Sequence, residues 1–259
     1  MPMTAATPLL QVNDLCKAYA GVVAVDGVSF QVNDNEIVGI IGPNGSGKST
    51  TIDCITGFQT PDRGHVALGG VSIDGQPSWK IARAGLMRTF QTVRVYEQMT
   101  LADNLLTAME PFDSANWIDA VLRSPRLRRE ESAARDRAQR LIRLVGLERY
   151  TDIPVGILSY GQKKLVALAA ALMPKPKLVV LDEPVAGVNP TRVREIEEAI
   201  RSLQQSGETF LIIEHNMDFI MGLCNRVIVF DQGRKLIEGS PDLVHSDPRV
   251  LEAYLGVRA

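Results

Sequence analysis

The chain contains the stretch Gly42-Pro43-Asn44-Gly45-Ser46-Gly47-Lys48-Ser49, which has the P-loop spacing of glycine, four residues, then Gly-Lys-Ser. The apolar run Ile37 to Ile41 precedes it, and the run Ser49 to Ile55 that follows is compatible with a helix. A strand, a glycine-rich loop and a helix in this order are the context that the motif requires, so the stretch predicts an α/β fold that binds a nucleotide. The alternative, a chance match to the bare pattern, is disfavoured by these flanking elements.

The chemistry of this loop follows from its residue types. Glycines let successive backbone N–H groups point into one anion-binding concavity, and the helix that begins near Lys48 adds the positive end of its dipole. Lys48 can reach the β- and γ-phosphates and the Ser49 hydroxyl can ligate Mg²⁺, whereas Thr50 either assists at the phosphates or caps the helix. The predicted nucleotide-binding stretch therefore consists of Gly42, Pro43, Asn44, Gly45, Ser46, Gly47, Lys48, Ser49 and Thr50.

The composition is that of an ordinary globular protein, with 259 residues, 45% of them hydrophobic and 22% charged. This length suits one large domain, or one domain with a sizeable insertion. A net charge of −2 gives no sign of a nucleic-acid-binding surface. The cysteines Cys16, Cys54 and Cys224 are widely spaced, so we expect a reducing compartment and no disulfide framework.

The sequence also bears on the relation to a membrane. The first residues, Met1 to Pro8, lack the basic start and apolar run of a signal peptide. The longest apolar run, Leu165 to Met173, is far shorter than the ~20 residues that cross a bilayer. We therefore expect a soluble protein that is able to dock on a membrane protein.

Short apolar runs alternate with helical patterns in the second half of the chain, which favours a core of parallel strands. Strands are expected at Leu9–Val12, Gly27–Val32, Val66–Leu68, Leu178–Leu181, Phe210–Ile213 and Arg226–Phe230. Helices are expected at Leu101–Leu106, Ala133–Val145, Lys163–Met173 and Thr191–Gln204. One apolar face of the second helix is predicted from Ala134, Ala138, Leu141, Ile142 and Val145. Asp231–Arg234 is typical of a hairpin turn into a strand at Lys235–Ile237.

The segment Arg126 to Glu131 is basic only locally. One interpretation is a solvated helix start with mixed charges, and the other is a contact with acidic lipid or with a partner. The residue types alone favour the first.

A second group of polar residues follows the apolar strand at Leu178–Leu181. Asp182 is expected to hold Mg²⁺ from a strand beside the P-loop strand, as a Walker B carboxylate does. Because strand side chains alternate, we expect Glu183 to point to the other face and to polarise a water at the γ-phosphate. The alternative is a pair of strand-end charges in solvent.

Two further positions depend on context. His215 follows the strand ending at Ile213, at the sheet edge where ligands bind in such folds, which favours a γ-phosphate contact. The turn Ser159-Tyr160-Gly161-Gln162 precedes a helix and is either a second anion site or a simple N-cap. Taken alone, the cap is the stronger interpretation of that turn.

These elements together resemble the ATP-binding subunits of ABC transporters. Ser159-Tyr160-Gly161-Gln162 is similar to the family signature, Gln91 to its Q-loop glutamine and His215 to its switch histidine. Tyr19 lies where an aromatic residue stacks on adenine, and Gly187-Val188-Asn189-Pro190 occupies the D-loop position.

The resemblance covers nearly the whole chain and implies a fold. That fold is the ABC ATPase fold, α/β, a P-loop NTPase core with an antiparallel β subdomain and an inserted α-helical subdomain. We therefore expect a single ATPase domain over residues 1–259, with the helical subdomain at about 92–165.

Three stretches narrow the resemblance to the ATPases of branched-chain amino-acid importers: Val93–Leu105, Ala186–Pro190 and Asp247–Gly256. An insertion around Asn116 to Glu131 is similar to the longer of the two ATPases that such importers pair. Tyr160 replaces the usual first glycine of the signature and Asn189 the usual D-loop aspartate, but both departures also occur in this branch.

The resemblance implies a head-to-tail dimer that holds two ATP molecules, each with Mg²⁺, at its interface. Lys48, Ser49, Gln91 and Asp182 of one subunit would hold each nucleotide, with Ser49, Gln91 and Asp182 on the metal side. Ser159 and Gly161, together with Gln162, would close on it from the other subunit. Glu183 would act as general base, with Gln91 and His215 as the other catalytic residues.

The implied partners are two permease subunits, a second ATPase subunit that is a copy or a paralogue, and, indirectly, an external solute-binding protein. The implied location is the cytoplasmic face of the inner membrane, and no nucleic-acid partner is expected. The alternatives are a non-transport ABC ATPase acting on nucleic acid or ribosomes, and an exporter ATPase for a lipid-linked substrate. A P-loop kinase or GTPase would share the loop but would not need the signature turn.

Overall fold

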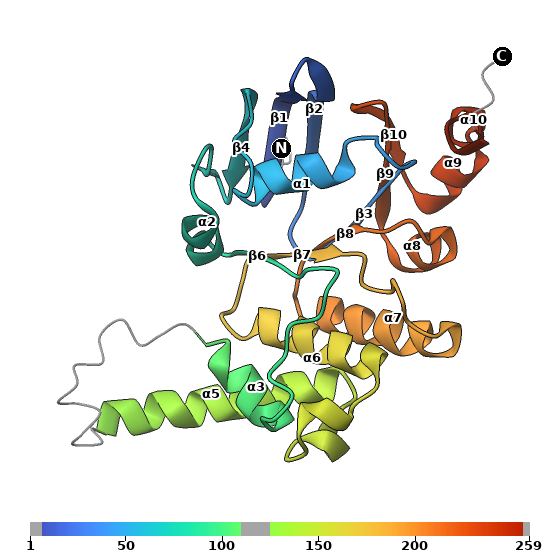
Figure 1. Ribbon diagram of the computed structural model, residues 1–259. Helices are drawn as coiled ribbons and strands as arrows, with labels where there is room; N and C mark the ends of the chain where they lie inside the picture. Colours follow the sequence, from blue (N-terminus) through green and yellow to red (C-terminus); the bar gives the residue numbers. More distant parts are fainter. Residues whose placement is uncertain (1–6, 110–124, 256–259) are drawn as a thin grey trace, which may run out of the picture. The chain divides into compact units, whose positions relative to one another are not determined.

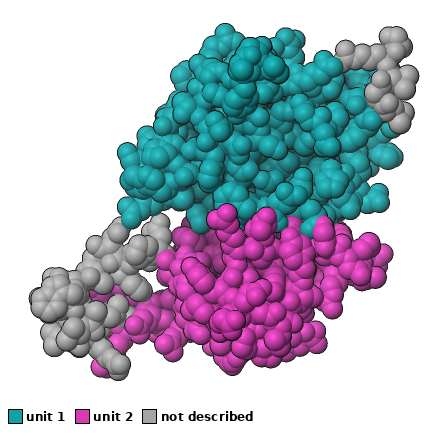
Figure 2. Space-filling model, in the orientation of Figure 1, with its two compact units in different colours: residues 1–91, 177–186, 204–259 teal, residues 92–176, 187–203 magenta. Residues whose placement is uncertain are grey.

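The computed structural model describes residues 7–109 and 125–255. The chain divides into two compact units, which Figure 2 shows in teal and magenta. Unit 1 comprises residues 1–91, 177–186 and 204–259, and unit 2 comprises residues 92–176 and 187–203. Most of the insertion expected around Asn116 lies outside the described residues. No helix of the described ranges is long and apolar enough to span a bilayer.

Unit 1 contains a six-stranded sheet in the order β10-β9-β3-β8-β7-β6 (Figure 1). The strands from β9 to β6 run parallel, and β10 is antiparallel to β9. Their bounds are β3 Ile37–Ile41, β6 Leu86–Arg88, β7 Leu178–Asp182, β8 Phe210–Ile213, β9 Arg226–Asp231 and β10 Arg234–Gly239. The expected parallel core is therefore confirmed, as is the hairpin between β9 and β10.

The order of these strands corrects one expectation. The strand that ends in Asp182 is not beside the P-loop strand, because β8 lies between β3 and β7. The register is explicit, since Leu211 of β8 pairs with Val38 on one side and with Val180 on the other. Neighbours in the sheet are chosen by the crossover connections and not by chain order, so apolar runs alone do not reveal them. As a result the end of β8, which carries His215, lies between the other two strand ends.

A second sheet of unit 1 is antiparallel, in the order β2-β1-β4-β5. Its strands are β1 Leu10–Tyr19, β2 Val22–Val32, β4 Arg63–Leu68 and β5 Val71–Ser72. The first two are longer than expected and join through Ala20 and Gly21, both with positive φ (45° and 88°), as a tight hairpin requires. The outer end of β1 lacks an apolar pattern, and the outer end of β2 is an apolar run whose first residues, Val22 and Val23, are exposed. Pattern analysis therefore found only the inner halves.

One hydrophobic core contains residues of both sheets and of helix α1, Lys48–Ile55. Phe230 is among its largest fully buried side chains. Helix α1 contacts β1 and β2, α8 contacts β3, and α9 contacts β9 and β10. The remaining helices of this unit are α2 Ser78–Ala84, α8 Met217–Leu223, α9 Pro241–Ser246 and α10 Pro248–Leu255.

Unit 2 is helical in the part that the structure describes. Its elements are α3 Leu101–Thr107, α5 Pro125–Leu144, α6 Tyr160–Leu172, two 3₁₀ turns at Glu148–Tyr150 and Val155–Ile157, and α7 Pro190–Gln205 as far as Leu203. Helices α3, α5 and α6 contact one another. The apolar face predicted on α5 is confirmed, since its five members are all buried. Helix α5 begins earlier than expected, at Pro125. Its first turns were not predicted because the exposed Arg126, Arg128 and Arg129 give no apolar pattern.

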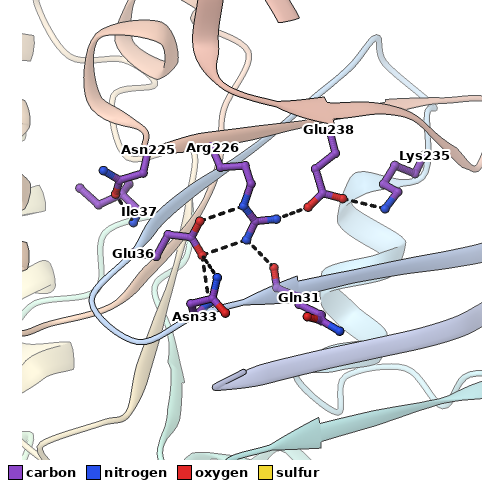
Figure 3. A network of polar contacts seen from close by, with 8 residues as sticks. All are labelled: Gln31, Asn33, Glu36, Ile37, Asn225, Arg226, Lys235 and Glu238. Atoms are coloured by element: carbon purple, nitrogen blue, oxygen red, sulfur yellow. Dashed lines mark hydrogen bonds and ion pairs between the residues drawn. The ribbon is translucent and has the colours of Figure 1, made fainter. Parts of the chain in front are cut away.

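An arginine network ties the end of β2 to the six-stranded sheet (Figure 3). Arg226, at the start of β9, donates two hydrogen bonds of 2.8 Å to the Glu36 carboxylate and one of 2.8 Å to the Gln31 carbonyl, and it also pairs with Glu238. Burial alone would raise the pKa of Glu36, but hydrogen bonds from Arg226 and Asn33 outweigh it and lower that pKa. The network therefore stabilises the fold above the ordinary carboxyl pKa and weakens as the pH falls through the lowered value.

Replacement of Arg226 by methionine is expected to destabilise the protein by about 2–3 kcal/mol, because Glu36 and Glu238 would lose their counter-charge in a half-buried place. Urea unfolding followed by circular dichroism measures the change. The control is Arg249→Met, which removes an exposed arginine paired with Asp247 and should cost far less than Arg226→Met. Equal losses in the two variants would contradict a special role for the network.

Candidate functional site

The P-loop connects β3, which is buried throughout, to α1. Gly47 precedes the helix with φ 96°, and Gly42 has φ 151°. A Cβ atom at Gly42 would lie 2.2 Å from the Phe230 carbonyl oxygen, and one at Gly47 would lie 2.4 Å from that of Ala24. Only glycine fits at these two positions, so the backbone of neighbouring strands fixes the path of the loop.

Lys48 lies folded over this loop. Its Nζ donates hydrogen bonds to the carbonyl oxygens of Gly42 (2.7 Å) and Pro43 (2.9 Å). Burial lowers the pKa of Lys48, and the negative charge of Glu183 opposes that shift. The ammonium group is therefore held above the loop by neutral acceptors, which are weaker partners than phosphate oxygens. Ser49, on the first turn of α1, is exposed beside it.

Asp182 is the last residue of β7, as expected, and it is paired. Its Oδ2 accepts a hydrogen bond of 2.7 Å from Nη2 of Arg88, whose Nη1 donates to Asp53 Oδ1 at 2.5 Å. Sequence reasoning missed Arg88 and Asp53. Their only sequence signal was position, because Arg88 lies three residues before Gln91 and Asp53 lies one helical turn after Ser49.

Glu183 lies beyond the end of β7 in the left-handed region, with φ 48°. Strand alternation therefore does not set its direction, which corrects the reasoning from the sequence. Its Oε2 accepts a hydrogen bond of 2.7 Å from Nε2 of Gln91, and its Oε1 lies 3.9 Å from Nδ1 of His215. A carboxylate in this strained backbone conformation persists only when its surroundings hold it there.

Glu214 is a further residue that the sequence analysis missed. Its side chain has no exposed surface, and its two oxygens accept hydrogen bonds from the backbone N–H groups of Val185 (3.2 Å), His215 (2.8 Å) and Asn216 (3.2 Å). Nδ1 of His215 also lies 3.1 Å from Glu214. This buried carboxylate thus ties the segment after Glu183 to the segment that carries His215. The adjacent Glu-His pair directly after a buried strand was the available signal.

Tyr19 ends β1 with 42% of its surface exposed, so its ring is open to a planar ligand. Nζ of Lys17 lies 5.5 Å from the ring centroid and also pairs with Asp62 at 2.9 Å. The aromatic residue and its cationic neighbour are therefore held in place by the antiparallel sheet.

The signature turn lies in unit 2. Ser159 and Gln162 form a capping box on α6, in which the Ser159 N–H donates to Gln162 Oε1 at 3.0 Å. A Cβ atom at Gly161 would lie 3.2 Å from Val188, so this glycine is closely packed. The Gln162 side chain is buried in the cap, Ser159 is the N-cap residue, and Gly161 is buried in the first turn of the helix.

Tyr160 in the signature and Asn189 in the D-loop, the two departures from the general family pattern, both make contacts within unit 2. The Tyr160 ring lies against Gly187, where an added Cβ would be 3.4 Å from Tyr160 Cε1. The Asn189 Oδ1 accepts hydrogen bonds from the backbone N–H (3.0 Å) and hydroxyl (2.8 Å) of Thr191. Tyr160 thus contacts the D-loop, and Asn189 caps the start of α7 through its amide oxygen.

Unit 1 therefore brings together two cations, several carboxylates and an imidazole at the carboxyl ends of β3, β8 and β7. Lys48, Gln91, Asp182, Glu183 and His215 are the predicted members of this group. A hydroxyl from Ser49 and a carboxylate from Asp182 are suited to a divalent cation that also takes phosphate oxygens. Within the described ranges no group of three or more His, Cys, Asp or Glu side chains could hold a metal by itself. The chemistry of such a set is phosphoryl transfer to water.

Comparison with known proteins agrees with this chemistry. Residues 25–186 match the family described as "ABC transporter". The chain is 37% identical over 250 residues to the high-affinity branched-chain amino acid transport ATP-binding protein BraF of Pseudomonas aeruginosa, covering 96% of this chain and 98% of the relative. It is 38% identical to the corresponding protein LivG of Escherichia coli, with the same coverage.

Solved structures are similar as well. The ADP conformation of MJ1267, an ATP-binding cassette of an ABC transporter, has a TM-score of 0.83 at 35% identity, covering 97% of this chain and 100% of that one. A nucleotide-free ATP-binding cassette from an ABC transporter has a TM-score of 0.81 at 34% identity, again covering 97% and 100%. The fold is therefore that of an ABC ATPase cassette.

Replacement of Glu214 by glutamine is expected to destabilise the protein by about 1–3 kcal/mol, because an amide NH₂ group would replace an oxygen that accepts from backbone N–H groups. Urea unfolding gives the free energy of unfolding. The control is Glu195→Gln, which changes an exposed partner of Arg192 and should cost less than about 1 kcal/mol. A fully stable Glu214→Gln protein would contradict the assigned contacts.

Proposed function

Because the chain belongs to the ABC transporter family, we propose that it is the ATP-hydrolysing subunit of an importer for branched-chain amino acids or similar small solutes. Members of this family hydrolyse ATP to power transport. The observation that carries the proposal is the contact of Gln91 with Glu183 at 2.7 Å, beside His215 and near Lys48. It supports Glu183 as a candidate general base beside the position proposed for the terminal phosphate of a P-loop nucleotide.

The substrate side of the proposal rests on the P-loop and Tyr19. The N–H groups of the loop and of the first turn of α1 would hold the phosphates, and Lys48 would exchange its two carbonyl partners for phosphate oxygens. Thr50 lies one position further along the same turn of α1. Tyr19 would stack on the base. ATP fits this arrangement in both charge and shape.

The metal side of the proposal uses Ser49, Asp182 and Gln91. Mg²⁺, when bound, would neutralise charge on the phosphate oxygens. Asp182 accepts a hydrogen bond from Arg88, and Ser49 is exposed on the first turn of α1. Gln91 donates a hydrogen bond to Glu183, and we propose that it also lies close to the metal.

In the hydrolytic step Glu183 would accept the proton of the attacking water. Gln91 donates to one of its oxygens and so leaves the other directed toward His215. His215 would hold the terminal phosphate and stabilise its developing charge. Glu214 holds the backbone on both sides of this group in one arrangement.

We further propose that two ATPase subunits act together. Ser159, Gly161 and the start of α6 would close on the nucleotide of the other subunit, which is either a copy of this chain or a paralogue. Residues 1–259 would then form one ATPase domain, with the helical unit as its inserted subdomain. The two subunits would drive a pair of permeases at the cytoplasmic face of the membrane, with an external solute-binding protein as an indirect partner.

Replacement of Glu183 by glutamine is expected to leave ATP affinity within about threefold and to lower steady-state turnover at least about 100-fold, because the amide cannot accept the proton. Calorimetry with Mg-ATP and a phosphate-release assay measure the two effects. Lys48→Ala is the contrasting variant, since it should lose phosphate binding itself. Turnover of Glu183→Gln at the wild-type rate would remove Glu183 from the mechanism.

The transport role is tested by purifying the tagged chain from detergent-solubilised membranes. Polytopic permease subunits are expected to co-purify, and the complex in vesicles should accumulate labelled leucine only with ATP. The matched control is the same complex with Glu183→Gln, which should assemble but not transport. Recovery of ribosomes or DNA without any permease would favour a non-transport ATPase instead.

A further inference from the structure

We propose that Arg88 is a positioning residue for Asp182, fixing one carboxylate oxygen so that the other faces the metal side of the nucleotide. The inference rests on the proposed function, because it assigns Asp182 to that side. It concerns a residue outside the P-loop, the signature and the group around Glu183. Four observations carry it.

The first observation is that the Arg88 guanidinium group donates hydrogen bonds to two carboxylates at once. Nη2 donates to Asp182 at 2.7 Å, and Nη1 donates to Asp53 at 2.5 Å and to the Thr56 hydroxyl at 3.3 Å. The side chain of Arg88 is only 10% exposed. A planar fork that bridges two acceptors fixes both of them, which a lysine ammonium does not do.

The second observation is a pair of aromatic rings beside the same group. The guanidinium carbon lies 5.5 Å from the centroid of the Phe58 ring and 5.3 Å from that of Phe90. The two rings contact each other edge to face at 5.5 Å. Their cation–π attraction adds to the hydrogen bonds that hold the guanidinium in place.

The third observation is the backbone register. Arg88 is the last residue of β6 and pairs with Val180 of β7, two residues before Asp182. The N–H of Thr89 donates to the Val180 carbonyl at 2.9 Å. Asp53 lies on α1, one turn after Ser49. Arg88 therefore connects the two elements that present the predicted metal-side groups, α1 and β7.

The fourth observation is how the carboxylate of Asp182 is used. Among the described residues its Oδ2 is bonded to Arg88, and its Oδ1 has no hydrogen-bond partner. The guanidinium thus sets the rotation of the carboxylate and leaves one oxygen for a metal or its water. It also balances charge, because Asp53 and Asp182 would otherwise place two half-buried negative charges beside a polyphosphate.

A purely structural role for Arg88 makes a different prediction from a positioning role. If Arg88 only joins β6, β7 and α1, its loss lowers stability and leaves the metal affinity of the folded protein unchanged. If Arg88 orients Asp182, its loss weakens metal binding in protein that is still folded and still binds nucleotide. The two roles are separated by a metal-affinity measurement that does not depend on turnover.

The experiment measures Mn²⁺, as a stand-in for Mg²⁺, bound to the full chain with ADP, from the electron paramagnetic resonance signal of free Mn²⁺. For Arg88→Gln we expect metal-free ADP affinity within about threefold and Mn²⁺ affinity about tenfold weaker, a typical effect for a residue behind a metal ligand. The Mg²⁺ concentration for half-maximal ATP hydrolysis should rise in parallel. Unchanged or tighter Mn²⁺ binding in the folded variant would overturn the proposal.

Two more variants keep the test decisive if Arg88→Gln does not fold. Arg88→Lys retains the charge but not the fork and should weaken Mn²⁺ binding about as much, so wild-type affinity in this variant would also overturn the proposal. Asp53→Asn removes the second anchor and should give a smaller loss. The control is Arg201→Gln, which removes an exposed arginine paired with Glu197 at 2.9 Å and should bind Mn²⁺ as the wild type does.

Failure of this inference is distinguishable from failure of the proposed function. If the wild-type chain binds no nucleotide and releases no phosphate, the proposed function is wrong. If the wild type binds ADP and hydrolyses ATP but Arg88→Gln binds Mn²⁺ equally well, only the positioning role is wrong.

Discussion

The structure of unit 1 depends on keeping unlike charges close together at the carboxyl ends of three parallel strands. The strands β3, β7 and β8 are almost wholly buried, so their ends are where polar side chains can first reach solvent and ligand. A lysine, an arginine, a histidine and several carboxylates meet there. Each carboxylate has a named partner, as it must have at such a partly buried edge, because an unpaired charge there would cost more free energy than the neighbouring contacts supply.

Local sequence patterns predicted the parts of this arrangement that depend on local geometry. The P-loop, the helix after it and the strand at Phe210–Ile213 were all predictable, because glycine spacing and apolar runs act over a few residues. The strand order was not, because β8 enters the sheet between β3 and β7 through crossovers that no apolar run encodes.

The same limit explains the residues that pattern analysis missed. The contacts of Arg88 and Glu214 form only when segments far apart in the chain meet. Arg88 contacts Asp53 and Asp182, and Glu214 contacts Val185. Glu183 shows the converse. Its role was predicted from its place after Asp182, but its left-handed backbone was not, because alternation applies only inside a strand.

The two cations of this edge differ in what holds them, and the difference assigns them different tasks. Lys48 donates to the neutral carbonyl oxygens of Gly42 and Pro43, which a polyphosphate can replace as a partner because its oxygens are charged. Arg88 donates to two carboxylates and lies against two aromatic rings, so an arriving anion offers it no better partner. One cation is thus available to the ligand, and the other stays with the protein. Nucleotide can therefore bind and leave at this sheet edge while the Asp182 carboxylate keeps its orientation toward the metal.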